Sequence, residues 1–369
     1  MEKTKKEPFV RIAKREDISM QKAWFIRIAA ILVALSIGAV IILILKHNPF
    51  EVYADMIRGS LKTKTSRVET VKIMVPLLGC AIAIAPAFKM KFWNIGAEGQ
   101  LLAGAIAATY FALFHYETMP RPVLLAVMFI AGAVAGGIAG LIPAIFRAKW
   151  GTNETLFTLM LNYILLGIEQ YLQNGPWKDP KGTGFPIIAM FDANARLPKV
   201  FGVHIGWIIV LLLVAAMFVY LRYSKHGYEI SVVGESERTA RYAGMNVPMI
   251  IMRTMFVSGA IAGIIGYITV CGADYTLNEG TAGGVGFTAI TVAWLAKLNP
   301  FTMIGISFFL AILSKGSNTI QTNFKIPASA SGVLTGIILF SMLACEFFIG
   351  YRVIFRGHRK KGDVKNDNA

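Results

Sequence analysis

Charged residues are scarce in this sequence, and acidic residues are scarcer than basic ones. Of 369 residues only 16% are charged, 55% are hydrophobic, and the mean hydropathy is +0.58. A chain of this length with so little charge is too apolar to form one solvated domain. The composition therefore argues against a soluble enzyme and favours a membrane protein.

The signatures of several chemistries are also missing. The three cysteines (Cys80, Cys271 and Cys345) lie in apolar stretches without C-x-x-C spacing, so the sequence indicates neither a disulfide framework nor a zinc site. The five histidines fall in loops or at the ends of apolar runs and form no metal-like pair. No segment reads G-x-x-x-x-G-K-[ST], so we expect no ATP bound by that motif and no cofactor in this chain.

Basic residues outnumber acidic ones, 37 to 21, but they gather at the two ends and between apolar runs. This distribution is typical of membrane topology rather than of nucleic-acid binding, and we expect no nucleic-acid partner. With both termini inside, most basic residues fall on the inner side. The basic segment from Lys46 to Lys72 does not fit this orientation, because it lies on the outer side.

Apolar stretches long enough to cross a bilayer recur along the chain. They predict an all-α protein of about ten transmembrane helices, some short or broken, with the N- and C-termini inside. We expect a basic cytoplasmic leader (1–23), a membrane domain (24–349) with a cytoplasmic segment (222–250), and a basic cytoplasmic tail (350–369). The ten ranges are 24–45, 71–88, 99–114, 122–146, 155–172, 206–221, 251–270, 285–296, 300–314 and 328–349.

Polar residues interrupt this pattern first between 92 and 100. The segment reads FWNIGAEGQ, and its glycines permit an unwound turn, while Asn94, Glu98 and Gln100 need polar partners at membrane depth. Two interpretations stay open. Asn94 can cap an ordinary helix with Glu98 complementing the helix dipole, or the segment faces a substrate path.

A second interruption, 276–290, is rich in glycine and precedes a short apolar run. It resembles the first, because in both a small-residue span leads into a glycine-punctuated polar stretch and then an alanine-rich helix. The predicted orientations of the two copies are opposite. This pairing is a sign of inverted repeats with broken helices near the membrane midplane.

The third interruption is the cytoplasmic segment 222–250. It predicts a helix of about two turns, with Ser236 as N-cap, Glu237 in the first turn and Gly244 just beyond the end. Its small residues, such as Ala240, make one side of the helix narrow enough to fit into a groove of a partner protein. The alternative is a solvated loop helix without a partner.

Glycines spaced by four residues suggest close helix packing, within the chain or across a dimer. Such pairs or triplets are Gly132/Gly136/Gly140, Gly259/Gly263 and Gly332/Gly336. Glu346 is an acid deep within a predicted span, where a packing role and a proton-relay role both stay open.

Four motifs in order carry a family resemblance: NIGAEGQ (94–100), NETLFTLMLNY (153–163), the segment from Gly234 to Asn246, and GFTAI (286–290). Together they resemble the permease subunits of ABC importers for nucleosides and simple sugars, a family that includes branched-chain amino acid and ribose permeases. The resemblance covers roughly residues 49–349. The NIGAEGQ form is similar to the nucleoside branch.

The resemblance implies a multi-pass subunit of the cell membrane that pairs with a second homologous permease or with itself. It also implies an extracellular substrate-binding lipoprotein and a cytoplasmic ABC ATPase that holds ATP and Mg²⁺. The family docks its ATPase on a coupling helix, here Glu235, Ser236, Arg238, Ala240, Arg241, Gly244 and Asn246. This sequence has Ser236 and Glu237 where Asn-Pro is usual, and Thr239 where Ala is usual, which leaves the identity of the ATPase open.

Our leading hypothesis is ATP-driven nucleoside import, with this chain forming half of the pathway and performing no covalent chemistry. Stacking rings and hydrogen-bonding groups suit a nucleoside. The candidate path residues are Phe92, Trp93, Asn94, Glu98, Gln100, Asn162, Phe287 and Thr288. Alternatives are the same machinery for a simple sugar or a riboflavin-like vitamin, and an ion-coupled carrier or channel. The carrier needs ionisable residues along its path, where Glu346 is nearly alone.

Overall fold

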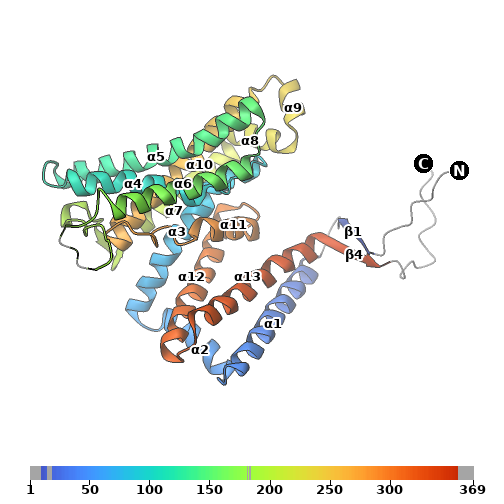
Figure 1. Ribbon diagram of the computed structural model, residues 1–369. Coiled ribbons are helices and arrows are strands. Elements are labelled where there is room, and N and C mark those ends of the chain that lie inside the picture. The colour runs from blue at the N-terminus through green and yellow to red at the C-terminus, as the bar shows by residue number, and fades with distance from the viewer. Residues whose placement is uncertain (1–9, 15–18, 181, 183, 356–369) are drawn as a thin grey trace. The chain divides into compact units, whose positions relative to one another are not determined.

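Residues 10–14, 19–180, 182 and 184–355 are described by the computed structural model (Figure 1). These residues form thirteen α-helices and four short strands, so the predicted all-α class is confirmed. Eight of the described helices are long and apolar enough to cross a membrane. Counting α1 (Met20–Ile44) and α2 (Pro49–Leu61) as one span raises that number to nine.

The chain divides into two compact units, and the smaller comprises residues 1–53 and 320–369. In it α1 packs against α13 (Ala328–Gly350), and the Tyr53 hydroxyl donates to the Leu35 carbonyl at 2.8 Å. Strand β1 (Val10–Lys14) pairs antiparallel with β4 (Tyr351–Phe355). No pattern in the sequence predicted these strands, and the rest of the leader and tail, 1–9, 15–18 and 356–369, lies outside the described residues.

The larger unit, residues 54–319, holds the remaining spans. Its helices are α3 (Lys64–Lys89), α4 (Ala97–Phe114), α5 (Arg121–Trp150), α6 (Glu154–Asn174), α7 (Gly206–Tyr223), α8 (Lys225–Glu235), α9 (Glu237–Tyr242), α10 (Val247–Ile268), α11 (Val285–Leu295) and α12 (Pro300–Asn323). A short 3₁₀ turn (Ala193–Ala195) and strands β2 (Lys199–Val200) and β3 (Val203–His204) lie between α6 and α7. α10 continues as a π-helical turn, Thr269–Asp274.

Each of the ten predicted ranges coincides with one helix, but several lengths differ. α11, predicted as a crossing, has only 11 residues and is shorter than the candidate spans. α3 begins at Lys64 rather than at residue 71. The sequence suggested a short span ending at Ser314, whereas α12 runs to Asn323. Just beyond Ser314, the Lys315 ammonium forms an ion pair with Glu69 of α3. The orientation of the termini and the inverted repeat remain predictions.

Glycines allow α4, α5 and α10 to pack backbone against backbone, as Figure 1 shows for α5 and α10 running side by side. A β-carbon placed on Gly136 of α5 would lie 2.6 Å from the Gly263 Cα of α10. A β-carbon on Gly140 would lie 2.5 Å from the Met255 carbonyl oxygen. The predicted packing role of the α5 and α10 glycines is therefore confirmed. Gly332 and Gly336 of α13 meet no neighbouring atom within 4 Å in the described residues.

Candidate functional site

The segment between α3 and α4 is unwound, and buried amides hold it. The Asn94 Nδ2 donates to the Gln100 Oε1 at 3.2 Å, and the Gln100 Nε2 donates to the Asn94 Oδ1 at 3.1 Å. The Ser258 hydroxyl of α10 also accepts from the Asn94 Nδ2 at 3.2 Å. Asn94 and Gln100 are 0% and 1% exposed, so their hydrogen bonds are satisfied within the chain.

Helix α6 also supports this segment. The Asn162 Nδ2 donates to the Ile95 carbonyl at 2.9 Å, and its Oδ1 accepts from the Gly99 backbone N–H at 2.9 Å. The Thr158 hydroxyl accepts from the Ile95 N–H at 3.3 Å. Asn162, a predicted path residue, is thus brought together with the NIGAEGQ motif, and its amide bridges the unwound turn to α6.

The role of a simple helix cap for Asn94 is wrong. α4 begins at Ala97 with Gly96 as N-cap, and Asn94 accepts from the Gly96 N–H at 2.9 Å in a local turn. Glu98 lies in the first turn of α4, yet its carboxylate bonds to another helix. It accepts from the Gly284 N–H at 2.7 Å and from the Gly286 N–H at 2.6 Å, at the start of α11.

Glu98 therefore joins the two interrupted segments that the sequence analysis paired. The start of α11 carries unpaired N–H groups and a partial positive charge, both of which a carboxylate satisfies. Gly286 is required there, because a β-carbon would lie 2.7 Å from the Glu98 Cα. The Thr288 hydroxyl is occupied locally and donates to the Gly284 carbonyl at 3.1 Å.

Aromatic rings form an exposed face beside this junction. Trp93 and Trp294 stack with their centroids 5.6 Å apart and their planes inclined by 27°. Phe88 contacts both rings at 5.8 and 5.9 Å. Trp93, Trp294 and Phe287 are 47%, 46% and 42% exposed, whereas the predicted path residue Phe92 is 4% exposed.

Trp294 was missed in the sequence because it lies within an apolar run. Its spacing of seven residues from Phe287 gives a signal, since residues two helical turns apart share one face of a helix. The aromatic face therefore combines Trp93 from the first interrupted segment with Phe287 and Trp294 from α11.

The predicted coupling segment contains two helices, α8 and α9, rather than one. In α9 the Ser236 hydroxyl accepts from the Thr239 N–H at 3.2 Å, and Gly244 has a φ of +75°, so the predicted cap and helix end are confirmed. The Asn246 Oδ1 caps α10 by accepting from the Met249 N–H at 3.2 Å. Ala240 is buried, while Glu235, Arg238 and Arg241 are exposed.

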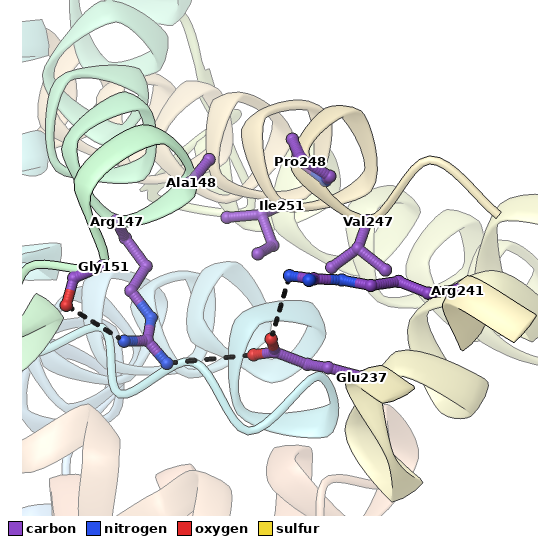
Figure 2. A pocket seen from close by; sticks show the side chains of 8 residues that line it. All are labelled: Arg147, Ala148, Gly151, Glu237, Arg241, Val247, Pro248 and Ile251. Carbon is purple, nitrogen blue, oxygen red and sulfur yellow. Dashed lines mark hydrogen bonds and ion pairs between the residues drawn. The ribbon is translucent and has the colours of Figure 1, made fainter. Parts of the chain in front are cut away.

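Arg147, at the end of α5, connects this segment to the membrane helices (Figure 2). Its guanidinium lies 3.4 Å from the Glu154 carboxylate of α6 and 3.8 Å from the Glu237 carboxylate of α9. Arg241 lies 3.9 Å from the same Glu237. A cavity of about 220 Å³ lies between these charges and the start of α10. No pattern in the sequence singled out Arg147.

Helix α8 is fixed to α10 and to the end of α3. The Arg253 guanidinium donates to the Glu229 carboxylate at 2.7 Å and holds the pKa of Glu229 below its usual range. A β-carbon on Gly234 would lie 3.3 Å from the Met90 Cα. α8 thus packs directly before the unwound segment that carries Trp93. Within the described residues, no group of three or more His, Cys, Asp or Glu side chains could hold a metal ion.

Comparison with known proteins identifies the family. Residues 68–343 match the family described as "Branched-chain amino acid transport system / permease component". The chain belongs to this family. As a permease component of an ABC importer it is an integral membrane protein that works with an ATPase and a substrate-binding protein and catalyses no reaction itself. The carrier and channel alternatives are thereby excluded.

Curated relatives cover nearly the whole permease. The glucose ABC transporter permease protein TsgB13 of Haloferax volcanii is 30% identical, over 97% of each chain. The nucleoside ABC transporter permease protein NupB of Lactococcus lactis is 32% identical, over 87% of this permease and 90% of NupB. The guanosine ABC transporter permease protein NupP of Bacillus subtilis is 29% identical, over 87% and 94%.

Proposed function

We propose that this permease forms half of the translocation pathway of an ATP-driven nucleoside importer. The exposed pair of Trp93 and Trp294 carries the proposal, because a nucleobase stacks on such rings and a sugar or amino acid side chain offers less flat surface. The names of NupB and NupP support the same substrate class. Phe287 extends the stacking face on α11.

In this proposal the buried polar residues of the junction position the aromatic rings and do not bind the substrate themselves. Asn94, Gln100 and Asn162 hold the unwound turn, and Glu98 holds α11 beside it, so that Trp93 and Trp294 face the path together. Phe92 is buried, and the Thr288 hydroxyl is bonded within α11, so neither belongs to the stacking face. A second permease, homologous or identical, supplies the other half of the path.

Transport follows from motion passed through the coupling segment. A cytoplasmic ATPase, which holds ATP and Mg²⁺, docks on the exposed side of α9 around Arg238, Arg241 and Tyr242. Its closure moves α8 and α9, and Arg147 passes the movement to α5 and α6. The junction of α4 and α11 then changes the side to which it opens. An extracellular lipoprotein delivers the substrate.

Glucose is the second candidate substrate, favoured by the 97% coverage of TsgB13. Uptake of labelled guanosine, adenosine, uridine, ribose, galactose, glucose and riboflavin, in cells with and without the gene, tests both candidates. We expect loss of nucleoside uptake alone. Loss of sugar or vitamin uptake with nucleoside uptake unchanged overturns the substrate assignment.

Replacing the stacked rings is expected to weaken substrate binding. In Trp93→Ala and Trp294→Ala, the KM for the imported nucleoside should rise about tenfold, because stacking a base on an aromatic ring is worth about 1–3 kcal/mol. Trp93→Phe should retain most of the affinity. Trp150→Ala, which removes a 64% exposed tryptophan at the end of α5, is the matched control. An unchanged KM in both alanine variants would contradict the stacking role.

Removing Arg147 is expected to uncouple ATP hydrolysis from transport. The ion pairs of Arg147 are partly exposed, so Arg147→Ala should cost less than about 1 kcal/mol of stability. The number of substrate molecules imported per ATP should nevertheless fall about fivefold or more, measured in liposomes with the assembled importer. The double variant with Glu237→Ala should be no worse than Arg147→Ala alone. Lys149→Ala is the control. If the coupling losses of Arg147→Ala and Glu237→Ala simply add in the double variant, the two residues do not pass the movement on together.

A further inference from the structure

Helix α6 carries a buried acid that the junction of α4 and α11 does not use. Glu169 is 0% exposed, and neither oxygen of its carboxylate has a hydrogen-bond partner among the described residues. Asn162, seven residues earlier, differs in this respect, because both ends of its amide bond to the unwound turn. A carboxylate inside a membrane helix is costly, and those that occur commonly mark the path of a substrate or ion. Glu169 is therefore a candidate for contact with a ligand.

Gln173, one helical turn after Glu169, adds a third oxygen of the same kind. Residues four apart lie on the same face of a helix. The Gln173 Nε2 donates to the Pro186 carbonyl at 3.0 Å, which fixes the orientation of the amide. The Gln173 Oε1 is buried and has no partner in the part of the chain that the structure describes. This face of α6 consequently presents three acceptor oxygens that are free to bind a donor.

The loop that leads into α11 lies beside these oxygens. Glu279 of this loop acts electrostatically on Glu169 and is itself exposed. As a second carboxylate it brings no donor and adds to the cost of the buried charge. Three glycines follow it before α11 begins, and Gly283 and Gly284 have φ angles of +51° and +77°. Such a loop can change its backbone conformation easily and so uncover Glu169.

Glu169 and the stacked tryptophans lie on opposite sides of the junction. α6 begins at Glu154, beside the coupling segment, and Asn162 meets Gly99 at the junction. Glu169 is a further two helical turns, or about 10 Å, away from the coupling segment. The stacked tryptophans instead contact Phe88, near the end of α3 against which α8 packs. A substrate that crosses the permease would meet the two places one after the other.

The chemistry of the three oxygens selects the ligand group. A carboxylate and an amide oxygen only accept hydrogen bonds, so the ligand must donate them. A nucleobase edge carries acceptors among its donors, and these acceptors would find no donor here. The 2′- and 3′-hydroxyls of ribose are adjacent and can both donate, and a carboxylate commonly binds the ribose 2′-hydroxyl of a nucleotide.

We infer that Glu169, together with Gln173, forms a ribose-binding site in the part of the permease away from the coupling segment. The carboxylate accepts from the 2′- and 3′-hydroxyls of the nucleoside, which reaches it when the loop before α11 moves. Glu169 thereby determines the preference for ribonucleosides over deoxyribonucleosides. The inference rests on the proposed nucleoside function and adds a second point of contact to it.

Competition between guanosine and 2′-deoxyguanosine tests the site in liposomes that hold the full importer with its substrate-binding protein. The wild type should prefer guanosine, and this preference should fall about tenfold in Glu169→Ala, because one hydrogen bond to a charged acceptor is lost. Glu169→Gln should be intermediate, since its amide keeps one acceptor. Gln170→Ala removes a half-buried side chain from another face of α6 and should keep the wild-type preference.

The yield of folded protein separates this role from a structural one. Glu169→Ala breaks no hydrogen bond among the described residues, so its yield should equal or exceed that of the wild type. If Glu169→Ala nevertheless folds poorly, Glu169→Gln decides the question, and a wild-type preference in that variant overturns the proposal.

The remaining outcomes distinguish the ribose site from the proposed function. An unchanged preference in an active Glu169→Ala overturns the ribose site and leaves nucleoside import standing. No nucleoside import by the wild type overturns the proposed function, and the ribose site with it. If import requires sodium ions in the wild type but not in Glu169→Ala, the carboxylate binds a cation and the ribose assignment is overturned.

Discussion

Leucine in place of Gly263 is expected to destabilise the helical bundle of the permease strongly. A β-carbon at this position meets the Gly132 carbonyl oxygen and lies 2.9 Å from the Gly136 Cα. Both neighbours are backbone atoms, which cannot rotate away as a side chain can. Overpacking of a side chain costs about 1–3 kcal/mol and occasionally more, and a clash of backbone against side chain belongs at the upper end of that range.

Because whole domains are stable by only about 5–15 kcal/mol, such a loss removes a large fraction of the stability and should clearly lower the unfolding temperature and the yield of folded protein. The yield of monodisperse protein in size-exclusion chromatography and its thermal unfolding temperature measure the effect. Gly305→Leu makes the same change on α12, where among the described residues no atom outside the helix's own turn lies within 4 Å of the new β-carbon, and should leave both quantities nearly unchanged. Equal yields for the two variants would falsify the close packing of α5 and α10.

Glu98→Ala is expected to reduce transport to a tenth or less of the wild-type rate. The substitution leaves the N–H groups of Gly284 and Gly286 without their acceptor, and leaving the buried Gly286 N–H unsatisfied costs about 1–3 kcal/mol. α11 should then lose its fixed position beside α4, and Trp294 its position beside Trp93.

The maximal transport rate and the binding of the ATPase distinguish this effect from general misfolding. Copurification of the ATPase should persist, since α8 and α9 do not contact Glu98 through any described hydrogen bond. Glu98→Gln should be intermediate, because its amide oxygen can accept one bond while its NH₂ group opposes the other donor. Glu117→Ala, an exposed acid after α4, is the control. If Glu98→Ala transports at the wild-type rate, the junction between α4 and α11 has no part in the mechanism.

Hydropathy was sufficient to locate the spans, because each apolar run must bury its backbone groups in a helix within the bilayer. It failed at Lys315, where the apolar pattern stops but the helix does not. The ion-pair partner of Lys315, Glu69, is 246 residues away in sequence, so no local pattern could reveal it. The strands β1 and β4 were missed for the same reason, since their partners come from opposite ends of the chain.

The candidate site was only partly predictable. Asn94, Glu98 and Asn162 stood out as polar residues at membrane depth, and the structure brings them to one junction. Whether each faces substrate or the fold depends on distant partners such as Ser258 and Gly284. Trp294, by contrast, did not stand out, because a tryptophan in an apolar run is indistinguishable from a core residue until its exposure is known.

The burial of the three cysteines makes this permease convenient for labelling. Cys80 and Cys271 are 0% exposed and Cys345 is 5% exposed, so a water-soluble maleimide should find no natural thiol to modify. A cysteine introduced at Tyr242 on α9 or at Phe287 on α11 can then carry a single fluorophore or spin probe in an otherwise natural sequence. Pairs of such probes can report how far the two sites separate during each transport cycle.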